Sequence, residues 1–521
     1  MRNPYSQRLG VWWIAHDHPD LPAVVASPSG TTLTFGELAG RAHQLVHALR
    51  AQGIGAGDIV AYALPNDVDI LWWPLAFQEM GVRSVALNPA LTAIEVGEIL
   101  EAADAKALVV HVGFTEIAKV ADGGPAKLRV SVGAAIDGFV PYEQLVDGQP
   151  TTPPDDRSFG VPISYSSGTT GRPKGIERPP VPGDPWDVAD GMKVFGQAFR
   201  MTPLAGVHLA SAGMHHGGCQ SFYQGALNVG QALAIMGKFD AEGALAMIQE
   251  HRVTTAYMVP TQFVRLLRLP EDVRQRYDTS SLEVVVHSAA PCPLEVKKQM
   301  MAWWGPVIWE TYGGMEGAAA IAKPHRWLEK PGTVGRAVRG MRIKILDDDG
   351  NELPPGEVGH VYLESSQPTF TYRNDPELTR SVYKGKAFTL GDVGYLDEDG
   401  YLFLLDRAKD MIISGGVNIY PAEVEGALTS HPLVADAAVF GVPDPEWGES
   451  VTAVVQLVAG TEETDELRAE LIEHCRARLA RFKCPRTIDF RAELPRTEAG
   501  KLYKRLLRDE YAQAAAGRDA G

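Results

Sequence analysis

YSSGTTGRPKG, at residues 165–175, is the most distinctive segment of the chain, and it follows a short apolar run at residues 161–164. Its glycines let the backbone curl closely around an anion, and its hydroxyls, backbone amides and lysine can bind phosphate oxygens. A solvated turn can share this composition, so the order of the residues carries the argument. That order does not fit the Walker A pattern. The residues expected to contact phosphate are Ser166, Ser167, Gly168, Thr169, Thr170, Gly171 and Lys174.

Six further segments occur in the order typical of the acyl-adenylate-forming superfamily, which the chain resembles from residue 30 to residue 510. This superfamily includes acyl-CoA synthetases, coumarate–CoA ligases, luciferases and peptide-synthetase adenylation domains, and the chain is most similar to a bacterial acyl-CoA synthetase. The resemblance implies that an acid and ATP give acyl-AMP and pyrophosphate, and that acyl-AMP and CoA then give acyl-CoA and AMP, with Mg²⁺ as a further cofactor. The segments are TFGEL (34–38), SAAP (288–291), ETYGGMEG (310–317), TLGDVGYLDEDGYL (389–402), DRAKDMIISGGVNIYPAEVE (406–425) and PRTEAGK (495–501).

The nucleoside is expected to lie between three of these segments. The resemblance implies that Tyr312 stacks on one face of adenine and that a short backbone stretch covers the other. Asp392 offers two acceptor oxygens, which suit the vicinal hydroxyls of ribose. Arg407 is expected to bind the same ribose or the phosphate. The remaining adenine contacts are expected from Ser288, Ala289, Ala290 and Gly313.

The phosphate end of ATP is expected to meet Glu316 and Thr170, which the resemblance implies as the Mg²⁺ site. Mg²⁺ prefers carboxylate and phosphate oxygens, which fits this assignment. Met315 departs from the family pattern, which places a threonine hydroxyl against the phosphate, and methionine cannot donate that hydrogen bond. Either a nearby hydroxyl such as that of Thr169, Thr170 or Thr311 replaces it, or adenylation is slower.

The C-terminal segments imply two working conformations. Lys409 occupies the family's hinge position, where small dihedral changes would rotate a C-terminal domain. Gly415 and Gly416 would then leave a passage for the pantetheine arm of CoA. Lys501 would reach the acid's carboxylate and the α-phosphate during adenylation, and would be remote when CoA attacks. No covalent enzyme intermediate is required.

AGMHHGG, at residues 212–218, is expected to border the acid. The resemblance implies that one histidine lies beside the carboxylate and gates the pocket, with His216 favoured over His215. Adjacent histidines rarely ligate one metal ion without a further cluster, and the sequence shows none. An amino-acid substrate is not expected, because the segment lacks an acidic residue for the α-amine; a fatty, aryl or steroid-like acid is. Further pocket residues are expected to be Gly217, Gln220, Met258, Thr261 and Gln262.

The pattern of strands and helices predicts an α/β protein. Residues 59–290 alternate short β-rich runs with helical patterns, which indicates parallel sheets covered on both faces. Strands are predicted at 59–64, 84–87, 107–111, 161–166, 207–210, 255–259 and 283–287, and helices at 35–52 and 241–251. Shorter strands at 342–346, 358–364 and 401–405 predict an antiparallel, β-barrel-like unit. With the resemblance, we expect a large N-terminal AMP-binding domain (1–408) with two doubly wound sheets, and a small mobile α+β domain (409–521).

Composition narrows the function further. The chain has 521 residues and a net charge of −16, so it lacks the basic footprint of a nucleic-acid-binding protein. Its four cysteines form no C-x-x-C pair, which argues against a zinc or redox motif and fits a reducing compartment. The apolar run at 70–77 is too short to span a membrane, and the N-terminus lacks the core of a secretory leader. We therefore expect a cytoplasmic enzyme whose partners are an acid, ATP and CoA.

Three alternatives stay open on the sequence alone. A free-standing acyl-AMP ligase would load a carrier protein in place of CoA. A luciferase-like oxygenase would share the fold and the adenylation site. A non-catalytic nucleotide sensor could keep the same scaffold, and Met315 is the feature that favours it.

Overall fold

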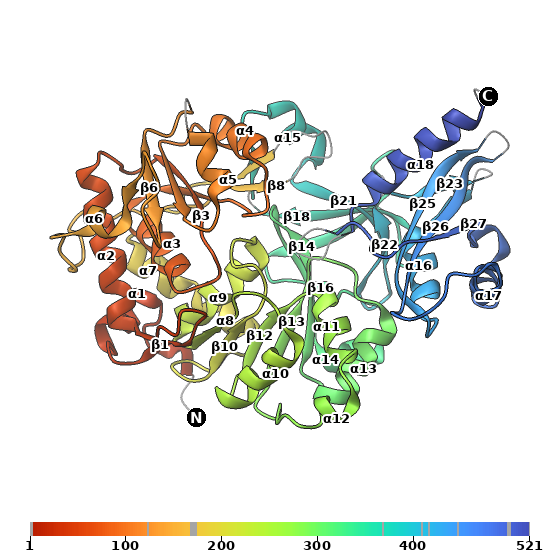
Figure 1. Ribbon diagram of the computed structural model, residues 1–521, viewed down its shortest axis with the longest axis horizontal. Coiled ribbons are helices and arrows are strands. Elements are labelled where there is room, and N and C mark those ends of the chain that lie inside the picture. The colour runs from red at the N-terminus through yellow and green to blue at the C-terminus, as the bar shows by residue number, and fades with distance from the viewer. Residues whose placement is uncertain are drawn as a thin grey trace.

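The structure is a computed structural model that describes residues 4–121, 124–166, 174–366, 369–407, 410–414, 417–444, 447–496 and 502–519. Two sheets with their helices form the larger, N-terminal part, and a smaller unit lies at the opposite end of the molecule (Figure 1). The predicted α/β class, with a large N-terminal and a small C-terminal part, is confirmed.

The first sheet consists of five parallel strands in the order β4-β3-β5-β6-β7. The predicted strands at 59–64, 84–87 and 107–111 are found here, within one residue at each end. Helix α2 (Phe35–Ala51) begins with a capping box, because the Thr34 hydroxyl accepts from the Glu37 amide (3.2 Å) and the Glu37 carboxylate accepts from the Thr34 amide (2.8 Å). The TFGEL segment is therefore a helix start. The other bounds are β3 Ile59–Ala63, β4 Arg83–Ala86, β5 Ala107–His111, β6 Leu128–Val132, β7 Val140–Pro141, α1 Val11–Asp17, α3 Asp69–Met80, α4 Ala93–Ala103, α5 Thr115–Ala118 and α6 Tyr142–Val146.

The second sheet has nine strands in the order β16-β15-β14-β13-β12-β10-β11-β1-β2. Its six central strands, from β14 to β1, are parallel, so their carboxyl ends share one edge. The predicted strands at 207–210, 255–259 and 283–287 are all found here. The bounds are β1 Pro22–Ala26, β2 Leu33–Thr34, β10 Val207–Ala210, β11 Ala232–Ile235, β12 Thr255–Met258, β13 Val284–His287, β14 Ile308–Gly314, β15 Gly317–Ala322, β16 Arg336–Ala337, α9 Gly217–Val229, α10 Ala241–Glu250, α11 Pro260–Leu267, α12 Glu271–Arg274, α13 Leu294–Trp304 and α14 Pro324–Glu329.

The strand predicted at 161–166 does not join either parallel sheet, which corrects the prediction. Only its end forms β8 (Ser164–Ser166), which pairs antiparallel with β9 (Lys174–Glu177), and β9 pairs with β19 (Thr371–Tyr372). These three strands form a small sheet of their own. Two short helices, α7 (Pro185–Gly191) and α8 (Lys193–Ala198), come next.

The expected antiparallel unit follows residue 330, and a separate α+β unit follows residue 410. In the first, β17, β18, β21 and β20 form a sheet, and β22 also pairs with β21. In the second, β24, β23, β26 and β25 form a sheet that β27 extends. The bounds are β17 Met341–Leu346, β18 Gly359–Ser365, α15 Pro376–Val382, β20 Tyr383–Lys384, β21 Ala387–Leu396, β22 Leu402–Arg407, β23 Ile412–Ser414, β24 Val417–Ile419, α16 Pro421–Thr429, β25 Val434–Asp444, β26 Gly448–Leu457, α17 Asp465–Arg476, β27 Thr487–Phe490 and α18 Lys504–Asp519.

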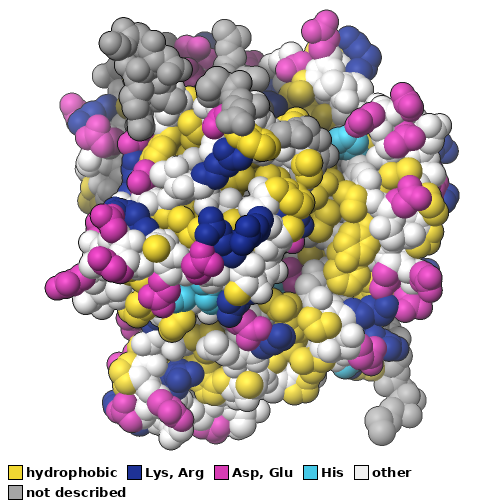
Figure 2. Space-filling view, turned by 90° about the vertical axis from the view of Figure 1, so that its right-hand side faces the viewer, with side chains coloured by type: hydrophobic (Ala, Val, Ile, Leu, Met, Phe, Trp, Pro, Cys, Tyr) yellow, Lys and Arg dark blue, Asp and Glu magenta, His cyan; other side chains and the backbone are white. Residues whose placement is uncertain are grey.

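Two apolar clusters cover the opposite faces of the second sheet. The first joins both N-terminal sheets and includes Tyr62 of β3, Phe222 of α9 and Tyr257 of β12. The second includes Met258 of β12 and Phe263 of α11. Figure 2 shows the end of the molecule that carries the C-terminal unit, where basic, acidic and apolar side chains are intermixed.

Candidate active site

The two ends of the predicted phosphate segment lie on the neighbouring antiparallel strands β8 and β9. Ser166 pairs with Lys174, while residues 167–173, and with them the predicted contacts Ser167, Gly168, Thr169, Thr170 and Gly171, lie outside the described residues, as does the Ser166 side chain. Gly175 is required by its neighbour, since a β-carbon there would lie 2.9 Å from the Tyr165 ring. The Lys174 ammonium lies 6.0 Å from the centre of the Tyr372 ring.

The turn between β14 and β15 brings Glu316 to the side chain of Tyr372. Tyr372 donates a hydrogen bond from its hydroxyl to Glu316 Oε1 (3.0 Å). Burial and the Glu316 carboxylate both raise the pKa of Tyr372, so its hydroxyl stays protonated and remains a donor. Arg178 Nη2 donates to the Met315 carbonyl (2.8 Å), and the Glu316 charge acts on the Arg178 guanidinium. Glu316 is therefore held by the Tyr372 hydroxyl and lies near the Arg178 guanidinium.

Tyr312 and Asp392, predicted for adenine and ribose, contact each other directly. The Tyr312 hydroxyl donates to Asp392 Oδ2 at 2.6 Å, and the Asp392 residue is only 8% exposed. Asp392 lies on β21 opposite Arg407 of β22 in backbone register, whereas the Arg407 side chain lies outside the described residues. Strands β14 and β21 thus bring together two residues that are far apart in sequence.

The SAAP segment follows β13 and turns beside β14. Ser288 Oγ donates to the Thr311 carbonyl at 2.8 Å, which joins this segment to the strand that carries Tyr312 and Gly313. Ala289 has a φ of +73°, a left-handed conformation that costs free energy for a residue with a β-carbon. Strain of this kind is concentrated at functional sites, which agrees with a backbone surface for the adenine ring formed by Ser288, Ala289 and Ala290.

A buried ion pair lies beneath these two segments. Lys297 of α13 is fully buried, and its ammonium donates to Glu310 Oε2 at 2.6 Å. The same oxygen is 3.5 Å from His287 Nε2. His287 directly precedes Ser288, and Glu310 lies two residues before Tyr312, so the pair supports both segments from inside. Neither Lys297 nor Glu310 was expected at the site, because the sequence gives no sign that they meet.

His215 and His216 lie together at the start of α9, with ring centres 4.0 Å apart. His216 is the N-cap residue of this helix. Burial, with a smaller effect of His216, lowers the pKa of His215 to about 3, and burial also lowers the pKa of His216. Both imidazoles are therefore neutral at physiological pH. Among the described residues, His216 Nε2 has no hydrogen-bond partner, and this atom is buried.

Residues that the sequence did not point to hold this loop in place. Asn66, after β3, donates to the Ala212 carbonyl (2.8 Å) and accepts from the Met214 amide (2.8 Å). Gln220, predicted as pocket lining, donates to the Tyr62 hydroxyl (3.0 Å). The Asn66 contacts join the segment after β3 to the loop before the histidines, and the Gln220 contact joins β3 to α9 after them.

The remaining predicted pocket residues divide into two groups. Gln262 is buried; it donates to the Ser211 carbonyl (2.9 Å) and accepts from the Val259 amide (3.0 Å), and so links the loops after β10 and β12. Thr261 is half-buried beside it. Met258 is fully buried in the apolar cluster on the other face of the sheet from Tyr257, so the structure does not place it with the histidines.

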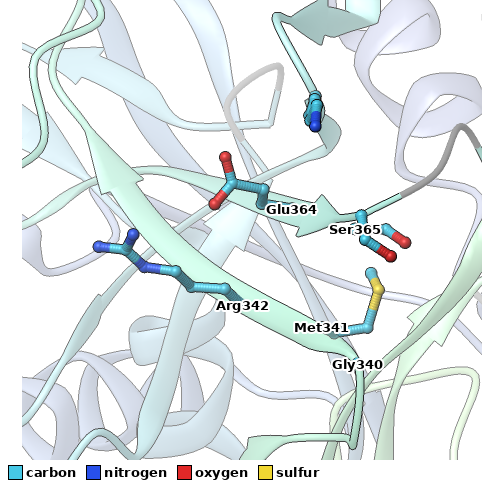
Figure 3. Close-up of a pocket in the computed structure, with 7 residues that line it drawn as sticks. Gly340, Met341, Arg342, Glu364 and Ser365 are labelled. Atoms are coloured by element: carbon cyan, nitrogen blue, oxygen red, sulfur yellow. The ribbon is translucent and has the colours of Figure 1, made fainter.

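Besides those of the phosphate segment, four further predicted residues lie outside the described residues: Lys409, Gly415, Gly416 and Lys501. Within the described part of the chain, every helix is too short or too polar to cross a membrane. A shallow recess lies over β17 and β18 of the antiparallel unit (Figure 3), and its lining includes none of the predicted site residues. It is lined by Gly340, Met341, Arg342, Glu364, Ser365, Ser366 and Lys386.

Comparison with known proteins agrees with this arrangement. The profile of the AMP-binding enzyme family matches residues 11–372, and that of the AMP-binding enzyme C-terminal domain matches residues 423–501. The chain belongs to the AMP-binding enzyme family. It is an AMP-forming acid–CoA ligase, which uses ATP, Mg²⁺ and CoA.

Three relatives of this AMP-binding enzyme illustrate the range of the family. Indoleacetate–CoA ligase from Aromatoleum aromaticum is 31% identical, over 91% of this chain and 92% of the relative. The fatty acid–[acyl-carrier-protein] ligase ScoC from Streptomyces coeruleorubidus is 30% identical, over 95% of each chain. The crystal structure of the anthranilate CoA ligase AuaEII with anthranoyl-AMP is similar with a TM-score of 0.86 and 26% identity, over 98% of each chain.

Glu316 fits the Mg²⁺ that this AMP-binding enzyme uses. Its carboxylate is a hard oxygen ligand and is held in position by the Tyr372 hydroxyl. In the described part of the chain, no group of three or more His, Cys, Asp or Glu residues could hold a metal ion. A single carboxylate together with ATP phosphates is the ligand set that Mg²⁺ commonly takes in such sites.

Proposed function

We propose that this enzyme activates a hydrophobic carboxylic acid at the start of α9 and transfers the acyl group to CoA. The observation that carries the proposal is the convergence of three subsites at the carboxyl edge of the second sheet. Tyr312 and Asp392 provide the nucleoside subsite, Glu316 the phosphate subsite, and His216 the acid subsite. The loops after β10, β13 and β14 bring them to one edge because these strands are parallel.

Each subsite has a defined task in adenylation. The neutral His216 imidazole can hydrogen-bond the acid's carboxylate, which must lie in line with the α-phosphate to attack it. Lys174, Lys501 and the hydroxyls of the phosphate segment offset the negative charge that develops on the phosphoryl oxygens. Bound Mg²⁺ supplies charge neutralisation at the phosphates next to Glu316. The protein's main contribution is positioning, because no covalent step on a side chain is required.

The second half-reaction requires a rotation of the C-terminal unit about Lys409, with the domain boundary between residues 408 and 409. Gly415 and Gly416 then line the passage for the pantetheine arm, and Lys501 leaves the site. In this structure Asp406 accepts from the Ala422 amide (2.9 Å), and Arg268 donates to the Ala435 carbonyl (3.0 Å). A rotation about Lys409 replaces both contacts, since each joins the two units.

The acid is proposed to be apolar, either aryl or fatty. The acid subsite supports this choice because its histidines are buried and neutral. The relatives named for indoleacetate, fatty acids and anthranilate support the same class. The match to ScoC also favours a second candidate acceptor, a carrier protein.

The test is acid-dependent release of pyrophosphate, with ATP, Mg²⁺ and a panel of aryl and fatty acids. Release of AMP is then compared with CoA and with a phosphopantetheinylated carrier protein as acceptors. Glu316→Gln should lower pyrophosphate release by on the order of 10²-fold or more. Glu364→Gln, a surface carboxylate paired with Lys344, should leave it unchanged. AMP release with the carrier protein but not with CoA would make the carrier protein the acceptor. Absence of pyrophosphate release with every acid would refute the proposed function.

A further inference from the structure

Met315 occupies the position where the family pattern has a threonine, but its side chain is directed at the acid subsite. Met315 and Glu316 form the two-residue turn between β14 and β15, in which Gly314 pairs with Gly317. The backbone of this turn is fixed by Arg178, which donates to the Met315 carbonyl (2.8 Å). The Met315 side chain is half-buried and packs toward the protein.

The Met315 side chain lies against the backbone of Gly217. A β-carbon placed on Gly217 would lie 2.5 Å from Met315 Sδ, so the thioether lies directly against the backbone of the first helical residue of α9. The backbone of Gly217 has no positive φ that would require glycine. A β-carbon at this position would therefore have to displace the end of the Met315 side chain.

His216 precedes Gly217 and is the residue proposed to face the acid's carboxylate. Gly218 follows it, and a β-carbon there would overlap the Tyr257 hydroxyl. The start of α9 is thus bounded by a thioether on one side and a tyrosine on the other. An acid bound with its carboxylate at His216 would therefore lie near the Met315 thioether.

We propose that Met315 is a wall of the acid pocket and sets the bulk of the acid that the enzyme accepts. The inference rests on the acid site proposed above and adds a specificity-determining residue to it. The sulfur of a methionine makes favourable contacts with aromatic rings, so this wall suits flat aryl acids, and the length of the side chain limits the bulk of the acid beside its carboxylate. The loss of the threonine hydroxyl is then the consequence of a pocket change and not a sign of inactivity.

Met315→Ala and Met315→Thr test the wall by shortening it. Pyrophosphate release is measured with a series of acids of increasing bulk beside the carboxylate. The ratio of kcat/KM for bulky to slim acids should rise about tenfold or more, the scale of a few methylene groups in a pocket, while the KM for ATP stays unchanged. Met341→Ala is the matched control, because Met341 packs on the same apolar cluster but lines the recess of Figure 3.

Gly217→Ala tests the contact from the other side. Its β-carbon displaces the thioether, so kcat/KM should fall for all acids, and Gly217→Ala combined with Met315→Ala should recover most of the loss. An unchanged acid profile in both Met315 variants, or a change in the KM for ATP alone, would overturn the assignment. Calorimetry gives the Kd of each acid without turnover, and the ratio of Kd values for bulky and slim acids should change in the Met315 variants in the same direction. A wild-type protein that binds the acids but releases no pyrophosphate would refute the proposed function and leave this assignment to the binding data.

Discussion

Two substitutions of Tyr312 separate the contributions of its ring and its hydroxyl to nucleotide binding. Tyr312→Phe keeps the ring that is predicted to stack on adenine, but removes the hydrogen bond to Asp392 (2.6 Å). Tyr312→Ala removes both. Because the carboxylate of Asp392 is buried and predicted to bind ribose, its orientation matters for ATP as well as for folding.

The magnitudes follow from the contact. A hydrogen bond to a charged group contributes about 1.5–3 kcal/mol. It is already formed without nucleotide, so Tyr312→Phe should lower the free energy of unfolding by about that amount and raise the Kd for ATP by at most about tenfold. Stacking of a base on an aromatic ring contributes about 1–3 kcal/mol, so Tyr312→Ala should raise the Kd a further 5- to 150-fold, approximately.

The assay is isothermal calorimetry of ATP binding, with urea unfolding followed by tryptophan fluorescence. Tyr395→Phe is the matched control, because Tyr395 lies on β21, the strand of Asp392, but stacks on Phe403 with ring centres 5.0 Å apart. Equal Kd values for the Phe and Ala variants would refute the stacking role. An unchanged stability of Tyr312→Phe would refute the role of the hydroxyl.

Three further predictions concern the surroundings of the site. Lys297→Met leaves the buried Glu310 carboxylate without its partner, so urea unfolding should show a loss of about 3–5 kcal/mol, which Glu310→Gln in the same chain should largely restore. Burial lowers the pKa values of His208 and His215 from 6.5 to about 3, so the unfolded chain binds more protons than the folded one below pH 6.5. The free energy of unfolding should therefore be highest above that pH and fall by about 1 kcal/mol per histidine at pH 5.5. Urea unfolding measures this, and a profile that does not change with pH would contradict it. Lys501→Ala should reduce acyl-AMP formation by on the order of 10²-fold or more, while conversion of pre-made acyl-AMP to acyl-CoA stays near the wild-type rate; equal loss of both would indicate a structural role.

The sequence was sufficient for features that depend on local chemistry. The TFGEL segment encodes a capping box, and the helix predicted from residue 35 begins there. The strand predicted at 107–111 is found with those bounds, and apolar residues fill its first four positions. The prediction for 161–166 was wrong about the sheet for a reason that is not local, because Ser164–Ser166 pair with β9, which pairs in turn with the distant β19.

The error at Met258 has a similar cause. A strand buried on both faces shows no alternation of polar and apolar residues, so the sequence cannot tell which side chains face α9. In β12 the side chain that faces α9 is Tyr257, whose ring centre lies 4.9 Å from that of Phe222. Met258 packs in the apolar cluster on the other face of the sheet. The sequence analysis did not identify the residues that support the site from distant segments. These are Asn66, Arg178 and the Lys297–Glu310 pair.

The position of the acid subsite has a basis in topology that is independent of the family resemblance. From β10 the chain passes through α9 to β11 on one side, and later through β12 and α11 to β13 on the other side. The direction of connection therefore reverses between β10 and β12, and in open α/β sheets ligands bind at the carboxyl ends of strands where this occurs. The loops after these two strands carry His216 and Gln262, and Gln262 joins them by its bond to the Ser211 carbonyl. Met315 reaches the same crevice from β14, two strands away, which makes the turn of that hairpin the third wall of the pocket.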